Sequence, residues 1–288
     1  MTEMRNPVFL DPRVVERDRW GRPLIVPPGE TKAVGYSRVT SFVGAPEDTY
    51  VLNVWEQHQL MDGLAHRPDL ILSAFAHRDN WGRLEEIREE ALEATLANTR
   101  ATIGTALHLL CDQVDGGQVN VRDIPDPWRA DVEMYLRLTE GWEWVAREEF
   151  RVYDKFRVAG TADRRGYDPA DGVCRIVDLK TGRIDSSPQK IAGQLRCYAK
   201  GVTYDLDTHE RGPEGEVDED KGVVVHVPAE ESETANFILP GRKPKKGDPA
   251  GLWYVDLGTI GAAHVELSAA IKDWRRVKDV FSPYTQEA

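Results

Sequence analysis

The sequence predicts an α/β fold in which a mixed central sheet is flanked by helices and preceded by a helical region. Helical periodicity is clearest in residues 83–100, where apolar residues recur every three or four positions. Two strand-like runs joined by a turn follow in residues 160–179, and further strand-like runs lie at residues 222–227 and 252–257. Strands that lie between helical stretches favour this fold class.

Length and composition favour one compact domain that is large enough to bury a substantial core. Of the 288 residues, 41% are hydrophobic, and no apolar run approaches the ~18 residues that a membrane-spanning helix requires. The first residues, Met-Thr-Glu-Met-Arg-Asn-Pro, lack the apolar stretch of a secretory signal. We therefore expect a cytosolic protein that does not associate with membranes.

The charge and the cysteines exclude several kinds of protein. The net charge of −12 has the wrong sign for a protein that coats nucleic acid by overall electrostatic attraction. The cysteines are too widely spaced for a disulfide framework or a zinc ribbon, and no C-x-x-C pair occurs. These cysteines are Cys111, Cys174 and Cys197.

The chain is predicted to begin with an extended arm, residues 1–36, followed by a single domain, residues 37–288. Five prolines in the arm prevent a continuous helix, so the arm either wraps around the domain or is partly disordered. The first part of the domain, residues 37–146, is expected to be helical. Short helices are predicted at residues 38–43, from Asp48 or Thr49 to about Met61, and from Pro68 onward.

The helix predicted at residues 83–100 has a clear amphipathic pattern. Its glutamates form a solvated face opposite the apolar stripe. The stripe consists of Leu84, Ile87, Ala91 and Leu92.

A histidine lies on the flank of the next predicted helix, residues 102–114. His108 shares a stripe with Gly104 and Cys111, at a spacing of four and three residues. A histidine in such a position is more often structural or merely exposed than a metal ligand. The neighbouring apolar stripe consists of Ile103, Leu107, Leu110 and Val114.

The sheet is expected to begin after a further helix. Residues 126–145 predict that helix, whose tryptophans are assigned to the core, and residues 148–152 predict the first strand of a core that extends over residues 147–202. Glu149 and Arg151 share one face of this strand. A salt bridge at the edge of the sheet explains Glu149 as well as a catalytic role does.

Two carboxylates and an ammonium group are predicted to meet on a hairpin. The first strand carries Asp163, the turn contains Asp168, Pro169, Asp171 and Gly172, and the second strand delivers Asp178 and Lys180. Side chains alternate along a strand, so Asp178 and Lys180 point to the same face, while Val177 and Leu179 face a core. Paired carboxylates on rigid strands suit a hard divalent cation.

A helix from Ser187-Pro188 to about Lys200 follows the hairpin. Its apolar face contains Gln194 and Tyr198, and a buried, unpaired glutamine amide costs about 1–3 kcal/mol. Gln194 therefore either reaches the ligands of the cation or forms one interior hydrogen bond in an ordinary amphipathic helix.

The C-terminal part, residues 222–280, contains two strands and a final helix at residues 258–280. Between the strands lies the densest positive cluster of the chain. Such a turn could contact DNA phosphates without sequence preference, or it could be a solubilising hairpin tip. The cluster consists of Arg242, Lys243, Lys245 and Lys246.

Five short motifs, in this order and spacing, resemble the PD-(D/E)XK nucleases, and among them the RecB-like and Cas4-like exonucleases of bacteriophages. The resemblance covers residues 102–200, roughly a third of the chain. The motifs are Gly104-Thr105-Ala106-Leu107-His108, Glu149, Gly160-Thr161-Ala162-Asp163, Asp178-Leu179-Lys180-Thr181-Gly182, and Gln194 with Tyr198.

The resemblance implies a restriction-endonuclease-like core and a DNA exonuclease that uses one or two Mg²⁺ or Mn²⁺ ions. It assigns the ion to His108, Asp163, Asp178 and the carbonyl of Leu179. It gives Lys180 the task of orienting and activating water, and it places Gln194, Tyr198 and Glu149 in the same site. Many of these relatives carry a four-cysteine iron–sulfur cluster, for which this chain has too few cysteines, so none is expected.

DNA is the expected partner, with a homo-oligomer or a recombination partner protein as further options. The resemblance implies a role in phage recombination, replication or repair, in the host cytoplasm. Two other functions remain open, namely a structure-specific endonuclease and a non-catalytic DNA-binding subunit that keeps the nuclease fold. An intact set of Asp163, Asp178 and Lys180 argues against the second of these.

Overall fold

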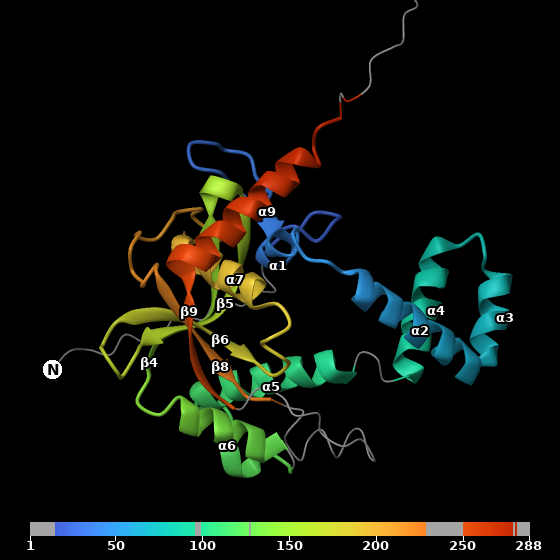
Figure 1. Ribbon diagram of the computed structural model, residues 1–288, viewed down its shortest axis with the longest axis horizontal. Coiled ribbons are helices and arrows are strands. Elements are labelled where there is room, and N and C mark those ends of the chain that lie inside the picture. Colours follow the sequence, from blue (N-terminus) through green and yellow to red (C-terminus); the bar gives the residue numbers. More distant parts are fainter. Residues whose placement is uncertain (1–14, 96–98, 127, 229–249, 279, 281–288) are drawn as a thin grey trace, which may run out of the picture. The chain divides into compact units, whose positions relative to one another are not determined.

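The computed structural model describes residues 15–95, 99–126, 128–228, 250–278 and 280 (Figure 1). They form a mixed α/β structure that divides into two compact units. We call residues 15–47, 133–228 and 250–280 the sheet unit, and residues 48–132 the helical unit. No helix among the described residues combines the length and the apolar composition needed to cross a membrane.

A mixed sheet of seven strands forms the centre of the sheet unit. The path runs β7-β4-β5-β6-β8-β9, and β3 pairs with β5 beside this path. The pairs β6–β8 and β3–β5 are parallel, and the other pairs are antiparallel. The strands are β3 (Ser37–Arg38), β4 (Glu143–Tyr153), β5 (Val158–Tyr167), β6 (Cys174–Lys180), β7 (Val202–Thr203), β8 (Lys221–His226) and β9 (Gly251–Asp256).

Three helices pack together against one face of this sheet (Figure 1). They are α1 (Val39–Val43), α7 (Pro188–Lys200) and α9 (Ala262–Trp274), the last preceded by a π-helical turn at Leu257–Gly261. A Cβ at Gly193 would lie 2.5 Å from the His264 ring, so glycine is required where α7 meets α9. The main core beneath them contains Val158, Ile176, Leu195, Val224 and Val265.

The N-terminal segment of the sheet unit packs on the sheet. Residues 15–36, the described part of the predicted arm, contain the short antiparallel strands β1 (Leu24–Ile25) and β2 (Val34–Gly35). Ile25 and Tyr36 are buried in a second core with Phe150 and Tyr204. This part of the arm is therefore held by apolar contacts with β4 and the segment after β7.

The helical unit contains α2 (Tyr50–His66), α3 (Pro68–Ala76), α4 (Trp81–Ala94) and α5 (Thr99–Asp115). Leu70, Ile87 and Ala91 form its core. A Cβ at Gly63 would lie 1.9 Å from the carbonyl oxygen of Ala91, so α2 and α4 are in backbone contact there. A short 3₁₀ helix, Val121–Asp123, follows α5.

One predicted helix is wrong. Residues 126–145 were expected to be a single helix, but α6 (Trp128–Leu138) ends early and β4 begins at Glu143. Gly141 has a φ of +84°, which turns the chain sharply between the two elements. Tryptophan and valine, which follow this turn at positions 142–145, fit a strand as readily as a helix. The stripe predicted on α5 also differs, because Cys111 is buried together with Ile103 and Leu107.

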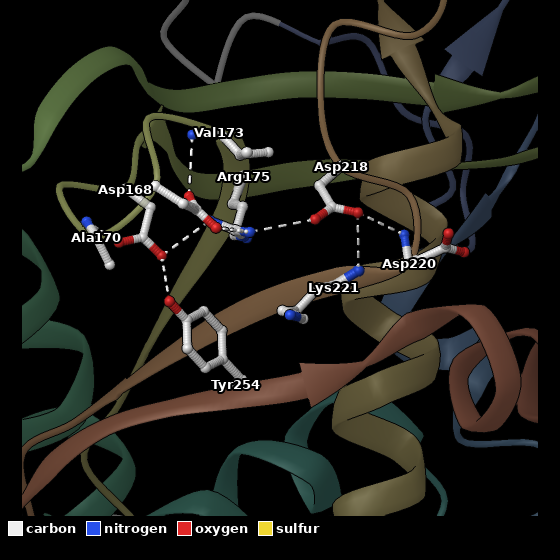
Figure 2. Close-up of polar contacts among 9 residues, drawn as sticks. Asp168, Ala170, Val173, Arg175, Asp218, Asp220, Lys221 and Tyr254 are labelled. Atoms are coloured by element: carbon white, nitrogen blue, oxygen red, sulfur yellow. Dashed lines mark hydrogen bonds and ion pairs between the residues drawn. The ribbon is translucent and has the colours of Figure 1, made fainter.

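The buried Arg175, together with Tyr254 of the edge strand β9, holds the β5–β6 turn (Figure 2). The Arg175 guanidinium lies 2.9 Å from a carboxylate oxygen of Asp168, 2.7 Å from one of Asp171 and 3.4 Å from one of Asp218. The Tyr254 hydroxyl of β9 donates a hydrogen bond of 2.7 Å to Asp168. The predicted turn residues thus anchor the hairpin that carries the candidate site.

Candidate active site

The candidate site lies where β5 and β6 stop pairing with each other. Their antiparallel ladder ends at Arg164 and Val177, one residue before Asp163 and Asp178, whereas β6 continues beside β8 to Lys180. Oδ2 of Asp163 accepts a hydrogen bond of 2.9 Å from the main-chain N–H of Leu179. The Asp163 carboxylate thus accepts the hydrogen bond that a main-chain carbonyl of β5 would accept in a continuous ladder, and it is held beside the main chain of β6.

Asp178 is the centre of the polar contacts. It is 1% exposed, and its Oδ2 lies 2.6 Å from Nζ of Lys180. The Gln194 amide of α7 donates a hydrogen bond of 3.2 Å to Oδ1. The structure therefore confirms that Asp178 and Lys180 share a face, and it brings Gln194 to the same carboxylate.

Lys180 remains a cation at neutral pH. Burial lowers the pKa of its ammonium group, but the negative charges of Asp178 and Asp163 and the hydrogen bond to Asp178 outweigh this effect, so the pKa lies above the ordinary value. Its side chain as a whole is 27% exposed.

Tyr198 is a neutral hydroxyl at the base of the site. Burial raises the pKa of its phenol well above the ordinary value, and the charges of Asp163 and Asp178 raise it further. A hydrogen bond with Gln194 has the opposite, smaller effect. The Tyr198 side chain also packs closely on β5, because a Cβ added at Gly160 would lie 3.2 Å from Tyr198 Oη. Gly160 of the predicted motif thus makes room for this tyrosine.

Glu149 is held by two arginines. Arg165 donates hydrogen bonds of 2.8 Å and 3.1 Å to its two carboxylate oxygens, and Arg151 donates to one of them. Arg151 also donates to the main-chain carbonyls of Tyr198 and Gly201, at 2.8 Å and 2.6 Å. These contacts favour the salt-bridge interpretation of Glu149, and they fix the C-terminal end of α7 to β4.

The backbone opposite Asp163 is irregular. The β4–β5 register pairs Arg147 with Arg164 and Glu149 with Ala162, which places Glu148 opposite Asp163. Glu148 has a φ of +47°, a conformation that side-chain-bearing residues rarely adopt. Residues in such conformations concentrate at functional sites, where surrounding structure holds them in place.

Two groups of predicted residues are not placed relative to the hairpin. His108 is partly exposed on α5, in the helical unit. Arg242, Lys243, Lys245 and Lys246 lie outside the described residues.

The donor set suits a hard cation. At the hairpin, the protein oxygens that could hold a cation include those of Asp163, Asp178 and the Leu179 carbonyl. The N–H and the carbonyl of one strand residue point to the same neighbouring strand, and the Leu179 N–H points to Asp163. Oxygen ligands that leave positions for water and phosphate are typical of Mg²⁺.

Some residues around the site were not found from the sequence. Arg165 was missed because its partner Glu149 lies on another strand, and the pairing depends on the register of β4 against β5. Arg151 had a signal, since it lies two positions from Glu149 on the same strand.

No family model matches the chain, and no curated protein matches it significantly.

Proposed function

We propose that the sheet unit is a restriction-endonuclease-like core of the PD-(D/E)XK type and that the protein is a metal-dependent DNA exonuclease, acting in recombination, replication or repair. The observation that supports this most is the meeting of Asp163, Asp178 and Lys180 where β5 and β6 separate. A lysine beside two carboxylates in a partly exposed position combines cation binding with phosphate binding.

Asp163, Asp178 and the carbonyl of Leu179 would hold Mg²⁺ or Mn²⁺. When bound, such an ion supplies positive charge that stabilises the phosphorane-like transition state. Gln194 orients the Asp178 carboxylate through its amide. The main-chain N–H of Leu179 does the same for Asp163.

Lys180 would act through its positive charge, since its ammonium group lies 2.6 Å from Asp178. Its ammonium group can position the attacking water and stabilise the phosphate oxygens. The water oxygen forms a bond to phosphorus and a proton of this water passes to solvent, while the bond to the leaving sugar oxygen breaks and that oxygen takes a proton from solvent. The neutral Tyr198 hydroxyl keeps its proton and serves only as a hydrogen-bond group.

Three DNA substrates test this proposal. End-labelled linear duplex, covalently closed circular duplex and single strands would be incubated with EDTA, Mg²⁺ or Mn²⁺. We expect cation-dependent release of nucleotides from linear DNA, an intact circle, and loss of activity in Asp163→Asn and Asp178→Asn. Asp273→Asn, an exposed acid on α9, is the matched control.

The alternatives give different results. Cleavage of the closed circle would replace the exonuclease with an endonuclease. Binding of DNA without cleavage under any cation would make the protein a non-catalytic DNA-binding subunit.

A further inference from the structure

An apolar groove lies beside the candidate site on the same face of the sheet. It has a volume of about 400 Å³ and lies between the start of α7, strands β8 and β9, and the π-helical turn. Its walls include Pro188 and Ile191 from α7, Val224 from β8, Trp253 and Val255 from β9, and Ile260 from the turn. This size falls in the range of pockets that bind small ligands.

Strand register connects this groove to Asp178. Asp178 of β6 is paired with Val224 of β8, and Val224 is paired with Trp253 of β9. Residues paired in register point to the same face of a sheet, so the Trp253 indole and the Asp178 carboxylate share a face. Two strand spacings separate them, about 10 Å. One or two nucleotides of an extended single strand bridge that distance.

The chemistry of the groove suits a flat, uncharged ring. Trp253 lines the groove and is 41% exposed, so part of this residue is open to a ligand. The carboxylate of Asp256 accepts hydrogen bonds from the main-chain N–H groups of Thr259 and Ile260 and thereby caps the π-helical turn. Apolar walls, an exposed indole and a nearby cation at Lys180 match a nucleobase joined to a phosphodiester.

We propose that the groove at Trp253 binds an unpaired nucleobase next to the phosphodiester held at Asp163 and Asp178. This inference rests on the proposed nuclease function and adds a substrate class to it, namely DNA with a single-stranded segment at the site. A base inside a duplex is paired and stacked, so it cannot enter the groove without first leaving the duplex.

The test compares Trp253→Ala and Trp253→Phe with Trp274→Ala, which removes a tryptophan that is 75% exposed at the end of α9. Binding of fluorescein-labelled single strands is measured by anisotropy with Ca²⁺, and cleavage is measured with Mg²⁺. The strands are intact or carry one abasic nucleotide, placed at each position in turn. Melting temperatures show whether each variant is folded.

We expect Trp253→Ala to weaken binding of the intact strand by roughly 5- to 150-fold, the range for loss of one base–aromatic stack. Trp253→Phe should retain most of the binding, and Trp274→Ala all of it. An abasic nucleotide at one position of the strand should weaken binding to the native protein by a similar factor. The same abasic nucleotide should not weaken binding to Trp253→Ala any further.

Two results overturn the inference, and they are distinct from failure of the nuclease proposal. If the native protein cleaves DNA and Trp253→Ala binds and cleaves the same DNA equally well, no base occupies the groove. The same follows if Trp253→Ala loses equal affinity for intact strands and for every abasic strand. If the native protein cleaves no DNA with either Mg²⁺ or Mn²⁺, the nuclease proposal fails first.

Discussion

Lys180 and Asp178 form an ion pair in which each group limits what the other can do. The Lys180 ammonium lies 2.6 Å from the carboxylate that is proposed to bind the cation, so a bound ion and the ammonium group compete for the same oxygen. The lysine therefore serves water and phosphate at the expense of cation affinity.

Replacing Lys180 with alanine should abolish cleavage and leave the affinity for Mn²⁺ equal or higher, because a competing positive charge is removed. Calorimetric titration of the variant with Mn²⁺ measures the affinity, and Lys278→Ala, an exposed position after α9, is the control. Loss of cation binding together with activity would show that the lysine supports the ligands instead.

Glu149 offers a second test, since its carboxylate is buried between Arg151 and Arg165. Breaking a buried pair from one side leaves a buried charge without its partner. Glu149→Gln should lower the free energy of unfolding by about 3 kcal/mol, measured by urea denaturation. At temperatures where the variant is folded, its cleavage rate should stay within a few-fold of the native rate. A stable variant that no longer cleaves DNA would return Glu149 to the catalytic residues.

At the scale of the elements, the hairpin and α7 could be predicted from local signals. The turn from Asp168 to Gly172 has residues that favour turns, and Ser187-Pro188 marks the start of α7, which is observed from Pro188 to Lys200. Both signals lie within a few residues of the structure that they determine. The position of Trp253 on the same face of the sheet as Asp178 could not be predicted in this way, because it depends on register across β6, β8 and β9.

The ion pairs of Arg175 with three aspartates give a prediction about how stability depends on pH. The guanidinium of Arg175 lowers the pKa of Asp171 to about 2, so this carboxylate stabilises the fold above its unfolded pKa of 3.8 and loses that contribution as the pH falls toward 2. Arg175→Met should lower the melting temperature strongly at pH 7, where three carboxylates then face each other without the cation.

The difference in melting temperature between native protein and Arg175→Met should narrow as the pH falls from about 4, the ordinary aspartate pKa, to about 2, the lowered pKa of Asp171, because the carboxylates are then protonated in both proteins. Melting curves at pH 7, 4 and 2.5 measure it. A difference that stays constant over this range would mean that packing, and not charge, dominates at this position.

At the scale of the whole molecule, the sequence predicted the mixed sheet and its helices, and the structure confirms that class. The division into a sheet unit and a helical unit follows from contacts between distant segments, which periodicity does not report. The restriction-endonuclease-like identity of the core and the nuclease function stay predictions, and the substrates proposed above test them.

The net charge of −12 makes the salt dependence of DNA binding informative. Neutralising Lys243, Lys245 and Lys246 should weaken binding to all DNA sequences and flatten the plot of log affinity against log salt concentration, because phosphate contacts release counterions. Binding titrations from low to high salt measure the slope. An unchanged slope would assign these residues to a solvated turn.

The hydrogen bond from the Leu179 N–H to Asp163 has a practical consequence. Most strand amides report only on the main chain of a neighbouring strand, but this one faces an ionisable side chain proposed as a metal ligand. Its ¹⁵N and ¹H chemical shifts should respond when the charge on that carboxylate is shared with a cation. A single amide resonance in isotope-labelled protein would thus follow occupancy of the site in the absence of DNA.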